Sequence, residues 1–241
     1  MADIRTETFT YSEGGVTLEG RIAYDAAKPG KRPGVLIFHS WTGPGPHETN
    51  AAEKLAAMGY IAICADIYGV GVRPTPPDAT LKEMLIYMKD RPLLRRRAQA
   101  ALARLRQHPN CDASRVGAIG YCFGGATVLE LARSGADIKG GVSFHGALNT
   151  PDAADARNIK APLLVLHGAA DPVVPQPEVD AFLKEMKDAN VDCTFVAYNN
   201  VLHSFTDPSA NAPAFGAAYD EKAAKRSWAH MADFFRETLG A

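Results

Sequence analysis

A sharp turn between a strand and a helix is predicted at Ile119-Gly120-Tyr121-Cys122-Phe123-Gly124-Gly125. Residues 116–119 before it form a short apolar run, which is typical of a buried strand. Residues 126–133 after it place apolar side chains at helical spacing. The glycines two positions before and after Cys122 suit a strained turn, because they remove Cβ atoms that would clash there. The pattern is that of a nucleophile elbow with a thiol in place of the usual hydroxyl.

Such an elbow places Cys122 at the N-terminus of a helix, where unpaired N–H groups and the helix dipole favour a thiolate. The alternative interpretation is a buried cysteine beside glycines that only permit close packing of the helix on the sheet. The pattern Gly-x-Cys-x-Gly does not separate these two interpretations by itself, so residues further along the chain have to decide.

Length and composition limit the class of protein. Hydrophobic residues make up 46% of the 241 positions, which excludes a disordered chain, and the length suits one α/β domain over residues 1–241. The formal net charge of −1 gives no reason to expect nucleic acid or a membrane as partner. Arginines over residues 91–106 alternate with leucine and alanine, so we interpret them as the solvated face of an amphipathic helix. We expect a monomer or small homo-oligomer.

The chain shows no apolar secretory signal at its start and no stretch long enough to span a bilayer. The cysteines form no CxxC pair and no metal-ligand spacing, and the histidines show no close ligand spacing either. We therefore expect no metal and no cofactor, and a reduced cytoplasmic location that keeps a thiol usable. The four cysteines are Cys64, Cys111, Cys122 and Cys193.

After an opening hairpin at residues 6–24, strands alternate with helices along the rest of the chain. This alternation predicts an α/β fold with a mostly parallel eight-stranded sheet and helices on both faces. The proline-rich residues 70–80 either border a pocket or form a plain surface loop. Further strands are expected at 35–39, 61–65, 116–119, 140–145, 163–167 and 194–198, and helices at 47–58, 81–89, 93–108, 126–133, 178–190 and 219–239.

Two further residues follow strands in the order that an α/β hydrolase requires. Asp171 lies in a turn after the strand at 163–167, and His203 follows the strand at 194–198. Parallel strands bring such loops to one edge of the sheet, so Cys122, Asp171 and His203 are predicted to meet as nucleophile, orienting acid and base. Taken singly, Asp171 before a proline can be a turn former and His203 a satisfied polar residue. The shared order and placement favour the triad.

These residues also carry a resemblance. The motifs Gly-Tyr-Cys-Phe-Gly-Gly, Gly-x-x-Asp-Pro-x-Val-Pro and His-Ser-Phe resemble those of the dienelactone hydrolase family, over about residues 16–239. The resemblance implies an α/β-hydrolase fold, the triad just named, and hydrolysis of a small ester or lactone through a thioester acyl-enzyme. It also implies that the backbone N–H groups of Trp41 and Phe123 form the oxyanion hole. A donor from the loop after the third strand is what the mechanism itself requires.

Two positions depart from the family's pattern. Ser40 stands where members of the best-known type carry a glutamate that pairs with the resting thiol, so we hypothesise that His203 deprotonates Cys122 directly and Ser40 only positions it. The family's substrate carboxylate is held by arginines, one of them shortly after the catalytic histidine, but residues 204–208 contain none. A neutral or cationic ester is therefore at least as suitable a substrate as an anionic lactone.

Other residues are assigned to the substrate pocket or its support. Ser40, Tyr68 and His145 are predicted to line the pocket, with packing in the core or at the rim as the alternative for His145, while His39 is predicted to hold the oxyanion loop by hydrogen bonds. Two functions other than hydrolysis remain possible on the same fold. The thiol could trap a ligand without turnover, or it could sense redox state, although no second cysteine is placed to resolve it.

Overall fold

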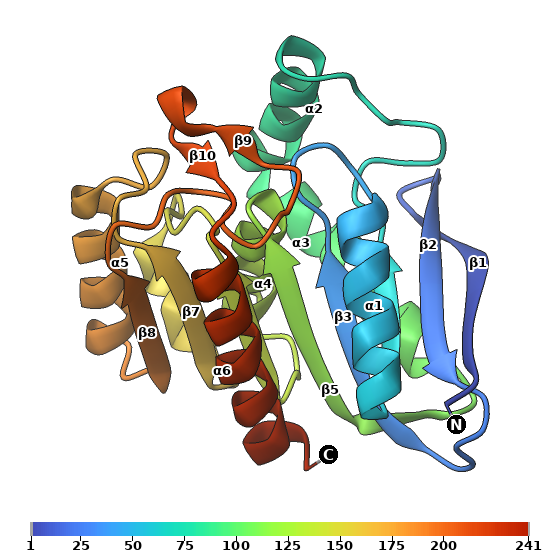
Figure 1. Cartoon of the computed structure of the whole chain (residues 1–241). Coiled ribbons are helices and arrows are strands. Elements are labelled where there is room, and N and C mark those ends of the chain that lie inside the picture. Colours follow the sequence, from blue (N-terminus) through green and yellow to red (C-terminus); the bar gives the residue numbers. More distant parts are fainter. Residues whose placement is uncertain (1, 241) are drawn as a thin grey trace.

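The computed structural model describes residues 2–240, and within them eight strands form one sheet in the order β1-β2-β4-β3-β5-β6-β7-β8 (Figure 1). The strand pairs β1–β2 and β2–β4 are antiparallel, and all other neighbours are parallel, as predicted. The strands are β1 Ile4–Glu13, β2 Val16–Asp25, β3 Arg32–Phe38, β4 Ile61–Ala65, β5 Cys111–Tyr121, β6 Gly140–Phe144, β7 Leu163–Gly168 and β8 Cys193–Tyr198.

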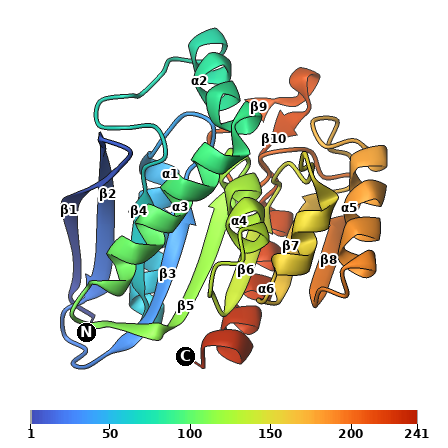
Figure 2. The ribbon, with the colours of Figure 1, turned by 180° about the vertical axis from the view of Figure 1, so that it is seen from behind.

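Helices cover both faces of this sheet. Helices α1 and α6 lie on the face toward the viewer in Figure 1, and α3, α4 and α5 lie on the opposite face, which Figure 2 shows. Helix α2 stands above the edge where the parallel strands end. The helices are α1 Pro46–Met58, α2 Asp78–Lys89, α3 Arg91–Arg106, α4 Phe123–Arg133, α5 Gln176–Asp188 and α6 Glu221–Leu239.

Capping residues explain where the helices differ from the sequence prediction. Helix α3 begins two residues earlier than expected, because the Asp90 side chain accepts the Leu93 N–H at 2.9 Å. Helix α6 begins two residues later, because the Asp220 side chain accepts the Ala223 N–H at 2.8 Å. Gly59 ends α1 in the left-handed conformation, with φ of 108°, as predicted for a C-cap.

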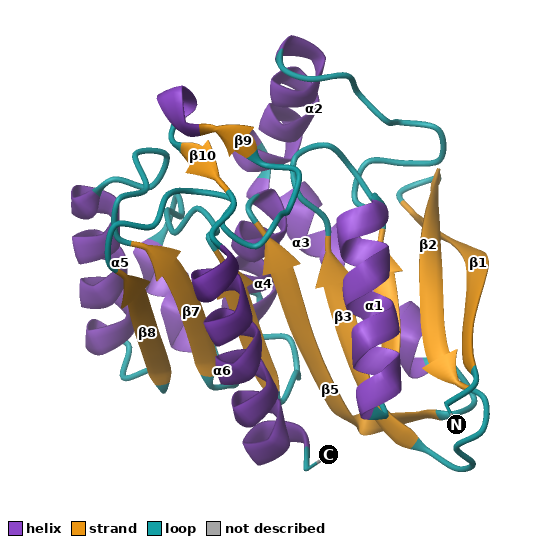
Figure 3. Ribbon diagram, viewed as in Figure 1, coloured by secondary structure: helices purple, strands orange, loops and turns teal. Residues whose placement is uncertain are grey.

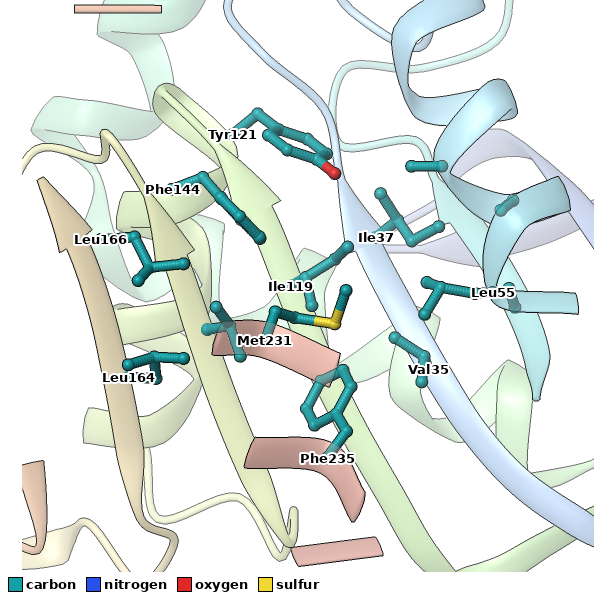
Figure 4. Close-up of a cluster of buried hydrophobic side chains, with 14 of the residues drawn as sticks. Val35, Ile37, Leu55, Ile119, Tyr121, Phe144, Leu164, Leu166, Met231 and Phe235 are labelled. Atoms are coloured by element: carbon teal, nitrogen blue, oxygen red, sulfur yellow. The ribbon is translucent and has the colours of Figure 1, made fainter. Parts of the chain in front are cut away.

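The core lies on both faces of the central strands. Every residue of β3 is buried, as its continuous apolar run predicts for a central parallel strand. On the α1–α6 face, Met231 and Phe235 of α6 pack against Val35 of β3 and Ile119 of β5 (Figure 4). Because this packing fixes the central strands, it also fixes the loops that follow them.

The prediction of a solvated arginine face on residues 91–106 is wrong for Arg91 and Arg97, which are only 4% and 5% exposed. Arg91 donates to the Asn149 side chain at 2.8 Å, and Arg97 forms an ion pair with Glu13 at 3.2 Å. The carboxylate of Glu130 lies 3.8 Å from Arg91 and also pairs with Arg95 at 2.8 Å. Buried charges need such partners, and the partners come from distant parts of the sequence that helical periodicity does not reveal.

Three small elements were not predicted. A two-stranded sheet, β9 Asn211–Ala212 with β10 Ala217–Ala218, rises above the main sheet, and two short 3-10 helices cover Ala153–Asn158 and Pro213–Phe215. The loops of the molecule gather at the edge toward which β5 and β7 point (Figure 3). Parallel α/β sheets place their binding groups at this edge.

Candidate active site

Cys122 sits at the turn between β5 and α4 in a strained backbone conformation, with φ of 54° and ψ of −113°. A Cβ on Gly120 would overlap with the backbone of Gly124, and a Cβ on Gly124 would overlap with the backbone of Phe38. The Cys122 N–H donates to the Phe144 carbonyl at 3.0 Å, which ties the turn to β6. The local geometry is therefore that of the predicted elbow, and the two glycines are required by close backbone contacts.

Asp171 and His203, which are 32 residues apart in the sequence, lie side by side. His203 Nδ1 donates to Asp171 Oδ2 at 2.7 Å, and both residues are buried. The other carboxylate oxygen, Oδ1, accepts the N–H groups of Val173 at 2.8 Å and Val174 at 3.3 Å. The carboxylate is thus held in place by its own turn, and it fixes the proton of His203 on Nδ1.

This tautomer leaves His203 Nε2 as the reactive nitrogen. Nε2 is buried and has no hydrogen-bond partner within residues 2–240. Burial disfavours a charge on the ring, but a thiolate at the nearby Cys122, together with the Asp171 carboxylate, outweighs it and raises the pKa of His203 to about 10. The arrangement stabilises a proton on His203 when Cys122 carries negative charge.

A short hairpin that the sequence did not reveal supports His203 from outside. The His203 N–H donates to the Gly216 carbonyl at 2.9 Å, and the His203 carbonyl accepts the Ala218 N–H at 3.0 Å. Gly216, with φ of 79°, packs so closely on Pro172 that a side chain would overlap with the proline ring. The hairpin therefore contacts both the histidine and the turn that carries Asp171.

His39 holds the loop after β3, as predicted. Its Nδ1 donates to the Ser40 carbonyl at 2.6 Å, and its Nε2 accepts the Ile67 N–H at 3.1 Å. Burial lowers the pKa of His39 to about 4, so the ring is neutral and can accept that second bond. The prediction that His39 supports this loop by hydrogen bonds is confirmed.

Glu48 is a second support of the same loop, and the sequence analysis missed it. Its Oε1 accepts the Ser40 N–H at 3.1 Å, and its Oε2 accepts the Gly45 N–H at 3.0 Å. The residue is 2% exposed, and burial raises its pKa. A glutamate three residues after the N-cap of a helix is the signature of a capping box and could have indicated this role.

The two N–H groups assigned to the oxyanion hole are unpaired. The Trp41 N–H donates no hydrogen bond within residues 2–240, and Phe123, as the first residue of α4, has no helical carbonyl to bond. Tyr68 fixes Trp41, since its hydroxyl donates to the Trp41 carbonyl at 2.8 Å. Burial, and then the charge of Cys122, raise the pKa of Tyr68 and keep this hydroxyl protonated.

The remaining residues assigned to the pocket are Ser40 and His145. Ser40 Oγ pairs with Thr42 Oγ1 at 3.1 Å, and no hydrogen bond joins it to Cys122 within residues 2–240. The His145 ring packs edge-on against that of His203, with 5.2 Å between centroids, and its Nε2 pairs with Thr206 Oγ1 at 2.8 Å. His145 is 2% exposed, so it packs against His203 from inside the core.

A cavity of about 350 Å³ opens beside the loop after β3. Ser40 and Thr42 line it on one side, and Asp207 and Ser209 line it on the other. Glu48 contributes to its floor, and no lysine or arginine is among its lining residues. The cavity therefore presents hydroxyl, carboxylate, histidine and asparagine side chains but no lysine or arginine, and neither Cys122 nor His203 lines it.

Within residues 2–240, no group of three acidic, histidine or cysteine side chains is placed to hold a metal ion, and no helix is long and apolar enough to cross a membrane. Cys122, Cys64, Cys111 and Cys193 are all free thiols.

The sheet order and the loops after β5, β7 and β8 define the chain as an α/β hydrolase by fold. The sequence model of the dienelactone hydrolase family matches residues 18–239, and the chain belongs to that family. The crystal structure of P91, a dienelactone hydrolase-like promiscuous phosphotriesterase from metagenomic libraries, has a TM-score of 0.94 to this chain at 39% identity, and the match covers 99% of this chain and 100% of P91.

Two curated relatives extend the comparison. An uncharacterized protein of Caenorhabditis elegans is 40% identical over 61% of this chain and 94% of its own length. A protein of a Bradyrhizobium species, named "Probable 2-oxo-3-(5-oxofuran-2-ylidene)propanoate lactonase", is 26% identical over 92% of this chain and 91% of its own length. The chain is thus a dienelactone hydrolase-like hydrolase.

Proposed function

We propose that the protein hydrolyses a small ester or lactone with Cys122 as nucleophile, His203 as base and acid, and Asp171 as the residue that orients His203. The observation that carries this proposal is the hydrogen bond of 2.7 Å between His203 and Asp171, together with a free Nε2 on a ring whose pKa Cys122 raises more than any other group does. Family membership and the lactonase name of the Bradyrhizobium relative support the substrate class.

In the proposed reaction, the Cys122 sulfur attacks the substrate carbonyl and a negative charge develops on its oxygen. The unpaired N–H groups of Trp41 and Phe123 stabilise that charge. Protonated His203 then donates its proton to the leaving oxygen, and a thioester remains on Cys122. Neutral His203 next takes a proton from water, the hydroxide attacks the thioester, and the acid product leaves as His203 returns the proton to the sulfur. This sequence uses no cofactor.

We further propose that His203 deprotonates Cys122 directly. Glu48, which is the carboxylate of the oxyanion loop, is already bonded to the N–H groups of Ser40 and Gly45. The Ser40 hydroxyl pairs with Thr42 and cannot accept a proton at neutral pH. The pH midpoint of Cys122 alkylation by iodoacetamide is therefore expected to change in His203→Ala and to stay the same in Ser40→Ala. An unchanged midpoint in His203→Ala would contradict direct transfer.

The preferred substrate carries no negative charge in this proposal. The cavity beside the oxyanion loop is lined by Asp207 and Glu48 and by no lysine or arginine. Arg73 is no substitute, because its guanidinium donates to the carbonyls of Val72 at 2.8 Å and Gly69 at 3.2 Å. A carboxylate on the substrate would meet these acidic groups without compensation.

A second candidate function is hydrolysis of phosphate triesters, and the similarity to P91 favours it. A phosphoryl oxygen could occupy the place of the carbonyl oxygen, and Cys122 would form a thiophosphoryl enzyme after expelling one alkoxide or phenoxide. Water would then cleave the phosphorus–sulfur bond and release the diester. Neutral triesters also suit the acidic lining of the cavity.

The test is turnover of p-nitrophenyl acetate, γ-butyrolactone and paraoxon by wild type, Cys122→Ala and Asp171→Asn. The proposal expects no turnover in Cys122→Ala and a loss of about 10³- to 10⁴-fold in Asp171→Asn. The control is Cys193→Ala, which removes another free thiol in β8 and should keep full activity. Activity that survives in Cys122→Ala would overturn the proposal. A single burst without turnover would favour ligand trapping instead.

A further inference from the structure

A second cavity, of about 400 Å³, lies between α1 and α6 on the other side of the segment that follows His203. Neither Cys122 nor His203 lines it. Thr206 lines its upper wall and also bonds to His145, which packs against His203. The cavity is therefore separated from the proposed active site by one layer of residues, and the reaction proposed above does not use it.

The lining of this cavity contains a polar group without a partner. Tyr121 is 2% exposed and lines the cavity, but its hydroxyl makes no hydrogen bond within residues 2–240. Its ring stacks on Phe144, with 5.0 Å between centroids, and the two lie together at the ends of β5 and β6 (Figure 4). The residue lines the cavity and its hydroxyl is open to it, and burial raises the pKa of Tyr121, so the group is a protonated donor available to an acceptor in the cavity.

Two ammonium groups stand at the mouth of the cavity. Lys54 of α1 forms no ion pair within residues 2–240, and its Nζ lies 5.4 Å from the centroid of the Trp228 ring. Lys225 of α6 pairs with Glu221, but both side chains are more than 60% exposed. Lys225 can therefore leave Glu221 for a ligand at little cost in free energy. Glu48 lies close enough to Tyr121 to raise its pKa further, and Asp207 acts in the same way on His47, but neither carboxylate lines the cavity.

The walls are aromatic. Trp228 and Tyr219 of the lining are joined by the stacked pair of Tyr121 and Phe144. A ligand that satisfies all of these groups is flat, apolar along its length and anionic at one end. We propose that this cavity binds a small aromatic carboxylate, whose ring lies among the aromatic side chains and whose carboxylate accepts from the Tyr121 hydroxyl and the two lysines.

This site has the opposite charge preference to the cavity beside the oxyanion loop. The α1–α6 cavity has Lys54 and Lys225 at its mouth, whereas the other cavity has Glu48 and Asp207 and no cation. An anionic ring is therefore expected to bind where it cannot react, and the two sites should be separable by mutation.

The experiment is titration of the protein with benzoate, followed by saturation-transfer NMR and calorimetry, with benzamide as the neutral comparison. Benzoate should bind, and benzamide should bind at least tenfold more weakly. Tyr121→Phe removes only the hydroxyl and should weaken benzoate binding about tenfold, since hydrogen bonds to charged groups are among the stronger ones. Lys54→Gln should weaken it about threefold.

Two further variants make the result specific. Lys222→Gln changes an exposed lysine of α6 that does not line the cavity, and it should bind benzoate like the wild type. Cys122→Ala should also bind benzoate like the wild type, so the test of this binding site is independent of the proposed hydrolysis. Equal binding of benzoate and benzamide would overturn the proposal. So would unchanged binding in Tyr121→Phe with a wild-type melting temperature, or the absence of binding at about 10 mM benzoate.

Discussion

Gly216 and Pro172 are packed so closely that a methyl group on Gly216 would overlap with the proline ring. Gly216 also accepts the backbone N–H of His203 at 2.9 Å, and Pro172 directly follows Asp171. The two residues thus join the turn that carries the acid to the segment that carries the histidine. The hydrogen bond between Asp171 and His203 depends on this contact as well as on their own side chains.

The first prediction concerns that contact. Gly216→Ala should lower kcat/KM for p-nitrophenyl acetate about 100-fold, because moving His203 by a fraction of an ångström misaligns it with Cys122. Gly15→Ala is the matched control: Gly15 has the same φ of 79° but has nothing within 4 Å of its added methyl group. Gly15→Ala should introduce the same backbone strain as Gly216→Ala but keep the kcat/KM of the wild type. Equal activities in the two variants would contradict the prediction.

The second prediction concerns the charge of His203. Burial disfavours the charged ring, and a negative charge on Cys122 is the largest influence that raises the pKa of His203, to about 10. In Cys122→Ala the pKa of His203 should fall, because the raising effect is removed while burial remains. A histidine-selective ¹⁵N NMR titration measures this directly. Cys193→Ala should leave the titration of His203 as in the wild type. If the pKa of His203 fell in Cys193→Ala as well, that would argue against a specific pairing of His203 with Cys122.

The third prediction is a loss of stability in mild acid caused by His39. Its pKa is lowered to about 4 in the folded chain, by burial first, whereas an unfolded histidine titrates near 6.5. The stability that His39 contributes is therefore complete above pH 6.5 and falls as the pH drops toward 4, by up to about 1.4 kcal/mol per pH unit.

Urea unfolding at pH 7 and pH 5 checks this effect. The free energy of unfolding should fall more steeply with acid in the wild type than in His39→Gln, which keeps a donor and an acceptor at this position but does not titrate. Other buried histidines add to the slope in both proteins, so the difference between the two slopes isolates His39. Parallel slopes would show that His39 is not the group responsible.

The fourth prediction concerns the buried ion pairs between α4 and α5. Arg133 is 1% exposed and donates to both oxygens of Glu185 at 2.8 Å. Glu185→Ala should lower the free energy of unfolding by about 3 kcal/mol or more, because it leaves a buried guanidinium without that partner. Glu237→Ala, at an exposed position of α6, should change it by less than about 0.5 kcal/mol. Guanidinium chloride unfolding compares the two.

Local patterns sufficed for the central part of the fold. The apolar runs of β3 and β5, the glycines beside Cys122 and the turn at Asp171 are determined by residues adjacent in the sequence, so their placement could be predicted. His39 could be assigned for the same reason, since it bonds to the residue next to it in the loop.

Features that depend on distant partners could not be predicted. The hairpin of β9 and β10 has strands of two residues each, and it exists because His203 and Pro172 pack against it. The burial of Arg97 depends on Glu13, which lies on the first strand of the sheet. The helical periodicity of a sequence shows only which side chains can face solvent. Whether a charged side chain is instead buried depends on a partner far along the chain.

Helix α6 has a consequence for how the chain matures during synthesis. Met231 and Phe235 cover the same core cluster as Val35 and Ile119, which leave the ribosome much earlier. A nascent chain that already contains Cys122 and the other reacting groups therefore still exposes an apolar sheet face, until α6 emerges and packs on it. During that interval the chain is a substrate for chaperones and prone to association with other nascent chains, so changes in α6 should reduce yield before they reduce activity.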